Sequence, residues 1–409
     1  MSSSAPLPGA LTGTLTAPLT AVLTPPSQPR FTALPPLSLY IHLPWCLKKC
    51  PYCDFNSHEA REAVPEARYV DALMSDLESA LPSVWGRKLA TIFFGGGTPS
   101  LFSAESIDRI IAGVRARIPA PPGIEITLEA NPGTFEAQKF ADFASAGINR
   151  LSIGIQSFNA RHLKALGRVH DAGEAHRAVE IGLSTFGNIN LDLMYALPGQ
   201  SLDECIADVR TAIGYRPPHL SLYHLTLEPN TVFAKFPPPK LPDDDTAADM
   251  QDALGSMTAA SGFQHYETSA FAQPGMHSRH NRNYWEFGDY LGIGAGAHSK
   301  LSFANRIVRQ VRPKHPAQYL EKTEAGTPIA EEHDVTRNDV GFEFMLNAMR
   351  LTDGVPVALF SERTGFALPL VEPRLRAAEE KGLIVRDHQR IAPTELGRRF
   401  LNDLQQMFL

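Results

Sequence analysis

The sequence of 409 residues is poor in cysteine, in charge and in long apolar runs. It has 4 cysteines, and charged residues make up 20% of it. The N-terminus has neither the basic start nor the continuous apolar stretch of a signal peptide. Together with the small number of cysteines, this argues against a secreted disulfide scaffold. No apolar run reaches the length of a membrane span. The net charge of −6 argues against a general nucleic-acid-binding protein. These absences predict a cytoplasmic protein with reduced thiols and no transmembrane segment.

Charge is also missing from the beginning of the chain. Residues 1–36 are rich in Ser, Thr, Pro, Ala and Leu, and no charged side chain precedes Arg30. A transit peptide would be rich in arginine, and this segment is not. The composition predicts a disordered tail over residues 1–36.

The cysteines that are present are concentrated in one loop. Cys46, Cys50 and Cys53 have the spacing CxxxCxxC and follow a short apolar run. Three thiolates on one loop can hold three irons of a cubane iron–sulfur cluster, which leaves the fourth iron open to an exogenous ligand. The alternative is a structural zinc site with His42 or His58 as the fourth ligand, although a second cysteine pair is missing.

Short apolar runs alternate with amphipathic stretches from residue 37 to about residue 224. The runs predict strands at Leu37–His42, Leu89–Phe94, Ile124–Glu129, Arg150–Gly154, Asn188–Leu193 and His219–His224. The stretches predict helices at Ala67–Leu81, Ala104–Ile118, Phe135–Ala146, Gly173–Ser184 and Leu202–Ile213. Six βα repeats indicate a parallel α/β sheet with right-handed crossovers.

The pattern changes after about residue 235. A helix is predicted at Thr246–Ser261, and a Gly-rich run follows at Leu291–His298. From Asp334 onward, helices are predicted together with a hairpin at Leu383–Ile391 and a last helix at Thr394–Met407. Helices with one small hairpin indicate a compact winged-helix-like module, a shape that does not by itself imply DNA binding.

Polar residues and glycines gather just after the predicted strands. The cysteine loop follows the first strand, Gly95–Gly97 and Thr98 follow the second, and Glu129 ends the third. Gln156 follows the fourth strand and Asp192 ends the fifth. Because parallel βα folds place the carboxyl ends of their strands at one edge, these residues predict one shared site.

Several of these residues also have purely structural interpretations. The glycine loop lacks the GxGxxG and Walker patterns, so it is either a tight turn or a close approach to a cofactor. Glu129 would otherwise cap a helix, and Arg168 would otherwise be a solvated charge. Asp192 lies between apolar neighbours, where burial without a partner is costly, and this favours a ligand role.

His280 lies in the aromatic-rich segment His280–Trp285. Imidazole is a common ligand of heme iron, and the alternative is a buried histidine in a polar turn. The basic residues beyond it are either a solvated face or partners of heme propionates: Lys300, Arg306, Arg309, Arg312 and Lys314.

The cysteine loop, with Tyr52 inside it, resembles the signature loop of radical S-adenosylmethionine (SAM) proteins. Its flanks, Tyr40–Trp45 and Asp54–His58, are similar to those of oxygen-independent coproporphyrinogen III oxidases and their heme-chaperone relatives. The similarity runs from about residue 37 to 300. It implies a partial six-stranded (βα) barrel, a four-iron, four-sulfur (4Fe–4S) cluster and bound SAM, followed by a mainly helical, winged-helix-like C-terminal domain.

The resemblance also implies roles for particular residues. It assigns Cys46, Cys50 and Cys53 to the cluster, and it places Tyr40, Gly96 and Glu129 on a first SAM. In the oxidases a second SAM binds, and the matching positions here are Tyr52, Gly97, Thr98, Gln156, Arg168 and Asp192.

Two features separate the branches of this group. Phe55 stands where the oxidases have a further cysteine, and His280–Trp285 matches the HNxxYW motif of the chaperone branch. We therefore expect a heme chaperone that binds cluster, SAM and heme and passes heme to an acceptor protein, with a reducing electron donor as a further partner. One alternative is an oxidase that converts two propionates of coproporphyrinogen III to vinyls, and another is a radical SAM enzyme with an unrelated substrate. The expected domains are 37–300, the barrel with the motif, and 301–409.

Overall fold

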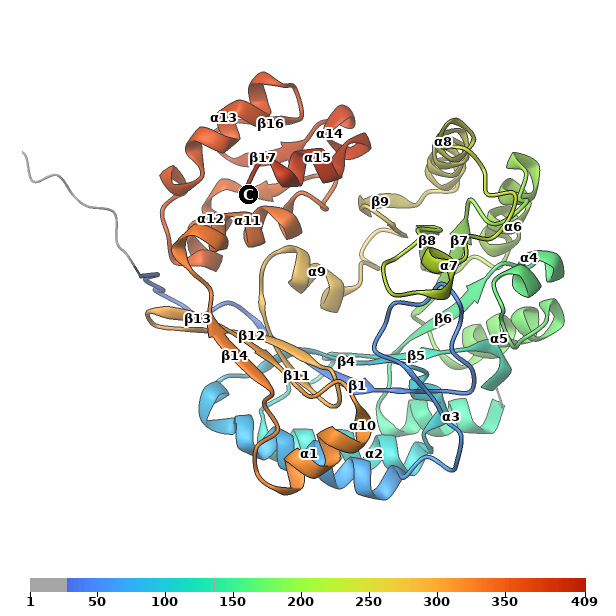
Figure 1. Cartoon of the computed structure of the whole chain (residues 1–409), viewed down its shortest axis with the longest axis horizontal. Coiled ribbons are helices and arrows are strands. Elements are labelled where there is room, and N and C mark those ends of the chain that lie inside the picture. Colours follow the sequence, from blue (N-terminus) through green and yellow to red (C-terminus); the bar gives the residue numbers. More distant parts are fainter. Residues whose placement is uncertain (1–27, 135–136) are drawn as a thin grey trace, which may run out of the picture.

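The computed structural model describes residues 28–134 and 137–409, so most of the expected tail at 1–36 lies outside the described residues. Within the described part, the main element is a mixed sheet of 12 strands (Figure 1). Its centre consists of the six predicted strands, all parallel, in the order β1 (Leu37–Leu43), β4 (Leu89–Gly96), β5 (Glu125–Ala130), β6 (Arg150–Gln156), β7 (Ile189–Tyr195) and β8 (His219–His224). The predicted α/β barrel core is therefore confirmed.

Alternation along each strand decides which side chains face the site. Leu39 and Ile41 of β1, like Leu128 of β5, are fully buried in the main hydrophobic core. Their neighbours Tyr40 and Glu129 point to the opposite, concave face, where they line a cavity. Because successive side chains of a strand point to opposite faces, an apolar outer face leaves every second residue free for chemistry.

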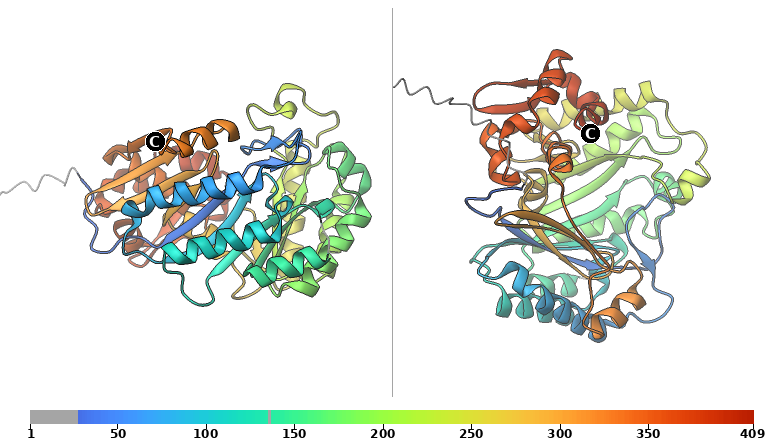
Figure 2. Two further views of the ribbon diagram at one scale, coloured as in Figure 1. Left: turned by 90° about the horizontal axis from the view of Figure 1, so that it is seen from below. Right: turned by 60° about the vertical axis from the view of Figure 1, so that its left-hand side comes forward.

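Helices cover the outer face of the parallel strands (Figures 1 and 2). They are α1 (Glu66–Ala80), α2 (Ala104–Arg117), α3 (Ala137–Ala146), α4 (Ala160–Ala165), α5 (Ala172–Thr185) and α6 (Leu202–Gly214). The starts of α5 and α6 carry capping boxes, in which Asp171 pairs with Glu174 and Ser201 with Glu204. The third helix was expected from Phe135, which lies outside the described residues.

The sheet continues beyond the six predicted strands on both sides. Beside β1 lie β11 (Asp289–Ile293), β12 (His298–Phe303), β13 (Arg306–Val311) and β14 (Glu331–Asp334), and beside β8 lie β10 (Ala270–Ala272) and β9 (Gln264–Glu267). Strand β11 is parallel to β1, whereas β12 to β14 are antiparallel to their neighbours. The sheet thus extends past the expected domain boundary at residue 300, and the sequence analysis missed these strands.

Further helices lie between these strands. They are α7 (Val232–Lys235), α8 (Asp244–Ala260), α9 (Arg279–Trp285) and α10 (Pro316–Glu324). Helix α8 corresponds to the predicted helix at Thr246–Ser261, and α9 holds the HNxxYW segment.

The C-terminal module has a separate hydrophobic core and lies on the opposite side of the sheet from α1 and α2 (Figure 1). Its helices are α11 (Arg337–Ala348), α12 (Val357–Thr364), α13 (Glu372–Glu380), α14 (Glu395–Arg399) and α15 (Leu401–Gln406). The predicted hairpin is β16 (Ile384–Arg386) with β17 (Arg390–Pro393), and β17 also pairs with β15 (Val355–Pro356). The single last helix predicted at Thr394–Met407 was wrong, because the backbone leaves the helical region at Phe400 and separates α14 from α15.

The beginning of the described chain packs on this module. The backbone N–H of Arg30 donates to the Gly365 carbonyl (2.8 Å), and Phe31 packs against the apolar core of the module. Residues 30 and 31, which were expected in the tail, therefore make defined contacts.

Two of the five residues of the basic stretch are internal rather than part of a solvated face. Lys300 and Arg312 are 1% and 0% exposed. Their partners are the buried carboxylates of Asp289 (2.9 Å) and Asp76 (3.1 Å). Buried charges require such pairing, so these residues join β12 and β13 to the rest of the fold.

Among the described residues, no helix is both long and apolar enough to cross a membrane.

Candidate functional site

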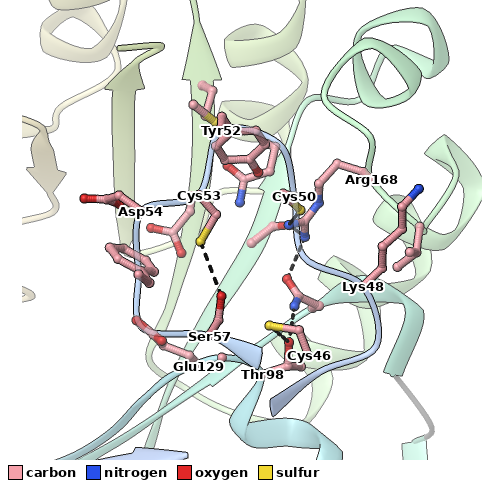
Figure 3. Close-up of a pocket in the computed structure, with 18 of the residues that line it drawn as sticks. Cys46, Lys48, Cys50, Tyr52, Cys53, Asp54, Ser57, Thr98, Glu129 and Arg168 are labelled. Carbon is pink, nitrogen blue, oxygen red and sulfur yellow. Dashed lines mark hydrogen bonds between the residues drawn. The ribbon is translucent and has the colours of Figure 1, made fainter. Parts of the chain in front are cut away.

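A cavity of about 330 Å³ opens at the carboxyl ends of the parallel strands, where the sequence placed the site (Figure 3). Most of the predicted site residues line it: Cys46, Cys50, Tyr52, Cys53, Gly96, Gly97, Thr98, Glu129, Gln156, Arg168 and Asp192. The volume is within the usual range for a small-molecule site. The structure thus brings together residues from the loop after β1, from the ends of β4, β5 and β6, from within β7 (Asp192) and from the segment after α4 (Arg168).

Each of the three clustered thiols has a polar neighbour. Thr98 Oγ1 donates to Cys46 Sγ, and Arg168 Nη1 donates to Cys50 Sγ, both at 3.6 Å. Cys53 Sγ lies 3.9 Å from Ser57 Oγ (Figure 3). Hydrogen bonds to cluster sulfurs tune reduction potential and hold the ligands in place. All three thiols are half-buried, which suits ligands of a redox centre that is screened from bulk water.

Thr98 and Arg168 are themselves joined through Asn131. Asn131 Nδ2 donates to Thr98 Oγ1 (2.7 Å), and Arg168 Nη2 donates to Asn131 Oδ1 (2.6 Å). A continuous arc of hydrogen bonds therefore runs from Cys46 to Cys50. Asn131 was not assigned a role from the sequence, although its place two residues after Glu129, at the same strand end, was a signal for one.

The donor set fits a cubane cluster better than a single ion. No three His, Cys, Asp or Glu side chains in residues 28–134 and 137–409 are grouped as ligands of one metal ion. In a cubane cluster each thiolate binds a different iron. The three thiol groups can therefore lie further apart than the ligands of a single metal ion. The proposed zinc ligands His42 and His58 line a neighbouring cavity instead, and His42 has both ring nitrogens in hydrogen bonds. Cys46, Cys50 and Cys53 would therefore hold the cluster.

The glycines of the second strand end join it to the cysteine loop. Gly97 N–H donates to the Leu43 carbonyl (2.8 Å), and Thr98 N–H donates to the Trp45 carbonyl (2.7 Å). A Cβ at Gly97 would overlap the Trp45 backbone, and Gly96 has a φ of +116°. Both positions require glycine on steric grounds. The loop is a tight turn and also a wall of the cavity, so the two sequence interpretations do not exclude each other.

Two carboxyl groups face the cavity with raised pKa values. Burial and the nearby Asp192 raise the pKa of Glu129 from 4.5 to about 8, and the Gly96 N–H, 3.2 Å from Oε2, acts against this. Burial raises the pKa of Asp192 as well, although Ser152 and Asn190 donate hydrogen bonds to it. The Glu129 carboxylate is therefore suited to pairing with a positively charged group of a ligand, which would offset the cost of its buried charge.

Gln156 holds an unusual backbone conformation. Its φ is +66°, and the pairing of β6 with β7 shifts register between Gly154 and Gln156. A residue other than glycine is strained in this left-handed region of backbone conformation, and such strain concentrates at functional sites. The distortion ends the regular strand where the cavity begins.

Two predicted site residues lie elsewhere. Tyr40 lines the neighbouring cavity, together with Gly96 and Glu129, which face both cavities. His280 lines neither: it is 1% exposed and stacks on Phe93. Its Nδ1 lies 2.7 Å from Thr91 Oγ1 and its Nε2 lies 3.1 Å from the hydroxyl of Tyr284. Burial lowers the pKa of His280 to about 3, so its ring is neutral.

Comparison with known proteins agrees with this geometry. Residues 40–212 match the Radical SAM superfamily model, and residues 335–400 match the HemN C-terminal domain. The chain is 47% identical to heme chaperone HemW of Escherichia coli, over 92% of this chain and 99% of that protein. The chain belongs to the HemW family. HemW proteins of Haemophilus influenzae (48% identity, 92% and 98% covered) and Bacillus subtilis (36%, 91% and 99%) are similar over the same extent.

A solved structure shows the same fold. Coproporphyrinogen III oxidase (HemN) from Escherichia coli, a radical SAM enzyme, matches with a TM-score of 0.77 at 23% identity, over 92% of this chain and 90% of that one. Membership of the radical SAM superfamily implies a 4Fe–4S cluster and SAM. A bound and reduced cluster would supply an electron for cleavage of SAM. The residues of this chain provide the three thiolates, the polar arc around them and the Glu129 carboxyl group.

Proposed function

We propose that this chain is a heme chaperone that binds a 4Fe–4S cluster, SAM and heme, and delivers heme to an acceptor protein. The observation that carries the proposal is the cavity at the strand ends. It gathers three half-buried thiols, their hydrogen-bond donors and the predicted SAM residues in one place. The names of the HemW relatives support heme as the cargo.

Individual roles follow from this placement. Cys46, Cys50 and Cys53 hold the cluster, and Glu129, at the shared wall of both cavities, receives the ammonium group of SAM. Asp192, which lies near Glu129, and Gln156 line the same cavity and bind further polar groups of SAM. Phe55, which occupies the position of the further cysteine of the oxidases, is 60% exposed beside the thiols.

The experiment compares carrier and enzyme on the same sample. Anaerobically reconstituted protein is titrated with hemin, mixed with an apo-cytochrome as acceptor, and separately incubated with coproporphyrinogen III, SAM and a reductant. We expect stoichiometric heme binding, transfer to the acceptor and no protoporphyrinogen. A Cys53→Ser variant, which lacks one cluster ligand, is the control for steps that need the cluster. Sustained conversion of coproporphyrinogen III would establish the oxidase instead.

A further inference from the structure

A second cavity, of about 600 Å³, adjoins the cysteine cavity, and apart from Tyr40, Gly96 and Glu129, which are predicted to contact SAM, its lining has no role in ligand binding so far. Gly96, Glu129 and the loop residues Cys53 to Ser57, except Asn56, line both. The remaining wall comes from β1, helix α9, β11, the start of β12 and the loop after β13, together with Lys49, Asn56 and His58 and the loop after β8. Its lining includes Tyr40, Tyr284 and Tyr290. An aromatic wall of this kind suits a large flat ligand, because aromatic rings prefer offset stacking on a planar π-system.

Three histidines line this second cavity, and they differ in what their rings already bind. His42 has Nδ1 beside the Tyr40 hydroxyl (3.1 Å) and Nε2 beside the Asn56 carbonyl (2.8 Å). His58 Nε2 lies 3.2 Å from the Lys314 carbonyl. His298, the exposed first residue of β12, has no hydrogen bond to its ring in the described part of the chain. Its imidazole is thus free to bind a metal centre.

Lys314 lines the same cavity, as does Lys49, whose ammonium donates to the carbonyls of Phe55 and Ser57. The other basic residues of its stretch have acidic partners: Lys300 with Asp289, Arg306 with Asp334, Arg309 with Glu343 and Arg312 with Asp76. The Lys314 ammonium has no ion pair or hydrogen bond to the described residues, although its backbone carbonyl accepts from the side chains of Asn56 and His58. An exposed ammonium at the rim of an aromatic cavity suits a carboxylate of the ligand.

Helix α9 connects the HNxxYW segment to this cavity through its tyrosine rather than its histidine. His280 is buried behind the wall and lies 3.1 Å from the Tyr284 hydroxyl, with the two rings edge to face. Tyr284 in turn meets Tyr290 edge to face at 4.6 Å, and both line the cavity. His280 therefore positions the aromatic wall.

We infer that the second cavity is the heme site, with the imidazole of His298 as an iron ligand and the ammonium of Lys314 beside a propionate. The inference rests on the proposed function, since it names the residues that hold the cargo. Heme lies against Tyr284 and Tyr290 and next to the cavity of the cluster, from which the Gly96–Glu129 wall separates it. His280 acts on heme through Tyr284, as a positioning residue.

The test is a hemin titration of the cluster-loaded full-length protein, followed by Soret absorbance and by electron paramagnetic resonance of ferric heme. We expect His298→Ala to shift the Soret band, to lose the histidine-ligated signal and to weaken heme binding at least about tenfold. Free imidazole should restore the signal in that variant. Lys314→Ala should weaken binding by about two- to fivefold without changing the spectrum, as for an exposed charge pair. His333→Ala, on β14, is the surface control.

The outcomes separate this inference from the proposed function. If wild-type protein binds heme and His298→Ala keeps both its spectrum and its affinity, the heme site is wrong and the chaperone function stands. If His58→Ala rather than His298→Ala shifts the Soret band and removes the histidine-ligated signal, the assignment of His298 is wrong. If wild-type protein takes up no heme, the proposed function itself fails. His280→Ala should weaken binding while the spectrum still shows a histidine ligand, and loss of that ligand signal with His298 intact would contradict its positioning role.

Discussion

The raised pKa of Glu129 predicts an unusual effect of removing its charge. Glu129→Gln should make the cluster-free protein more stable at alkaline pH. The ordinary pKa of 4.5 rises to about 8 in the folded state. Between these values the unfolded chain is ionised while the folded chain keeps the proton, so stability falls as pH rises from 4.5 to 8. Above pH 8 both states are ionised and the whole cost of the buried charge remains.

The size of the effect follows from the interval between the two pKa values. At about 1.4 kcal/mol per pH unit, the interval corresponds to about 5 kcal/mol. Glu129 lines an open cavity that water can enter, which lowers the cost, so we expect about 2 to 4 kcal/mol. At pH 9 the glutamine variant should be more stable by this amount, and near pH 4.5 the difference should nearly vanish.

Urea denaturation of both proteins at several pH values between 4.5 and 9 measures this difference directly. The matched control is Glu125→Gln on the same strand, because the Glu125 carboxylate accepts the backbone N–H groups of Arg279 and His280. That variant should lose stability at every pH. The Glu129→Gln variant should also bind SAM about tenfold more weakly or worse, since a charge-assisted hydrogen bond is lost. A substitution that stabilises the fold but weakens ligand binding identifies a side chain that serves function rather than folding.

A pH-independent difference between Glu129→Gln and wild type would refute this reasoning. So would a destabilised variant at pH 9, because it would show that the ionised carboxylate is already well paired inside the fold.

Three further predictions concern the core, the glycine turn and the thiol arc. Arg312→Met leaves the buried carboxylate of Asp76 without its ion pair, so the free energy of unfolding measured in urea should fall by about 3 to 5 kcal/mol. The double variant with Asp76→Leu should recover most of this loss. If it does not, the broken ion pair is not the cause. Gly97→Ala should abolish SAM binding by equilibrium dialysis, whereas Gly255→Ala in helix α8, with no atom within 4 Å of an added Cβ, should keep it. Equal binding by both variants would contradict the steric argument. Arg168→Met removes a positive charge and a hydrogen-bond donor from the thiolate of Cys50, so a redox titration should give a more negative reduction potential of the cluster. An unchanged potential would show that the hydrogen-bonded arc does not influence the cluster.

The parallel core and most of the site could be predicted from the sequence because both depend on local patterns. Apolar runs of strand length, alternating with amphipathic helices, located β1 and β4 to β8 to within a few residues. The rule that strand ends share one edge then brought Cys46, Glu129 and Asp192 together, as found in the cavity.

What the sequence did not reveal depends on contacts between distant segments. Lys300 in β12 and Arg312 directly after β13 are charges that suggest a surface until Asp289 and Asp76 are seen beside them. The role of Asn131 depends on hydrogen bonds to partners 33 and 37 residues away in sequence. His280 stood out because of its motif, but only the fold shows that its ring faces Thr91 and Tyr284 rather than a cavity.

The most direct test of the account is a Mössbauer spectrum of anaerobically reconstituted, ⁵⁷Fe-labelled protein, recorded without and with SAM. Three thiolates holding a cubane with one open corner predict a single 4Fe–4S species, in which one iron site changes when SAM is added. Zinc in place of iron, or a four-iron spectrum that SAM leaves unaltered, would contradict the assignment of the cysteine cavity.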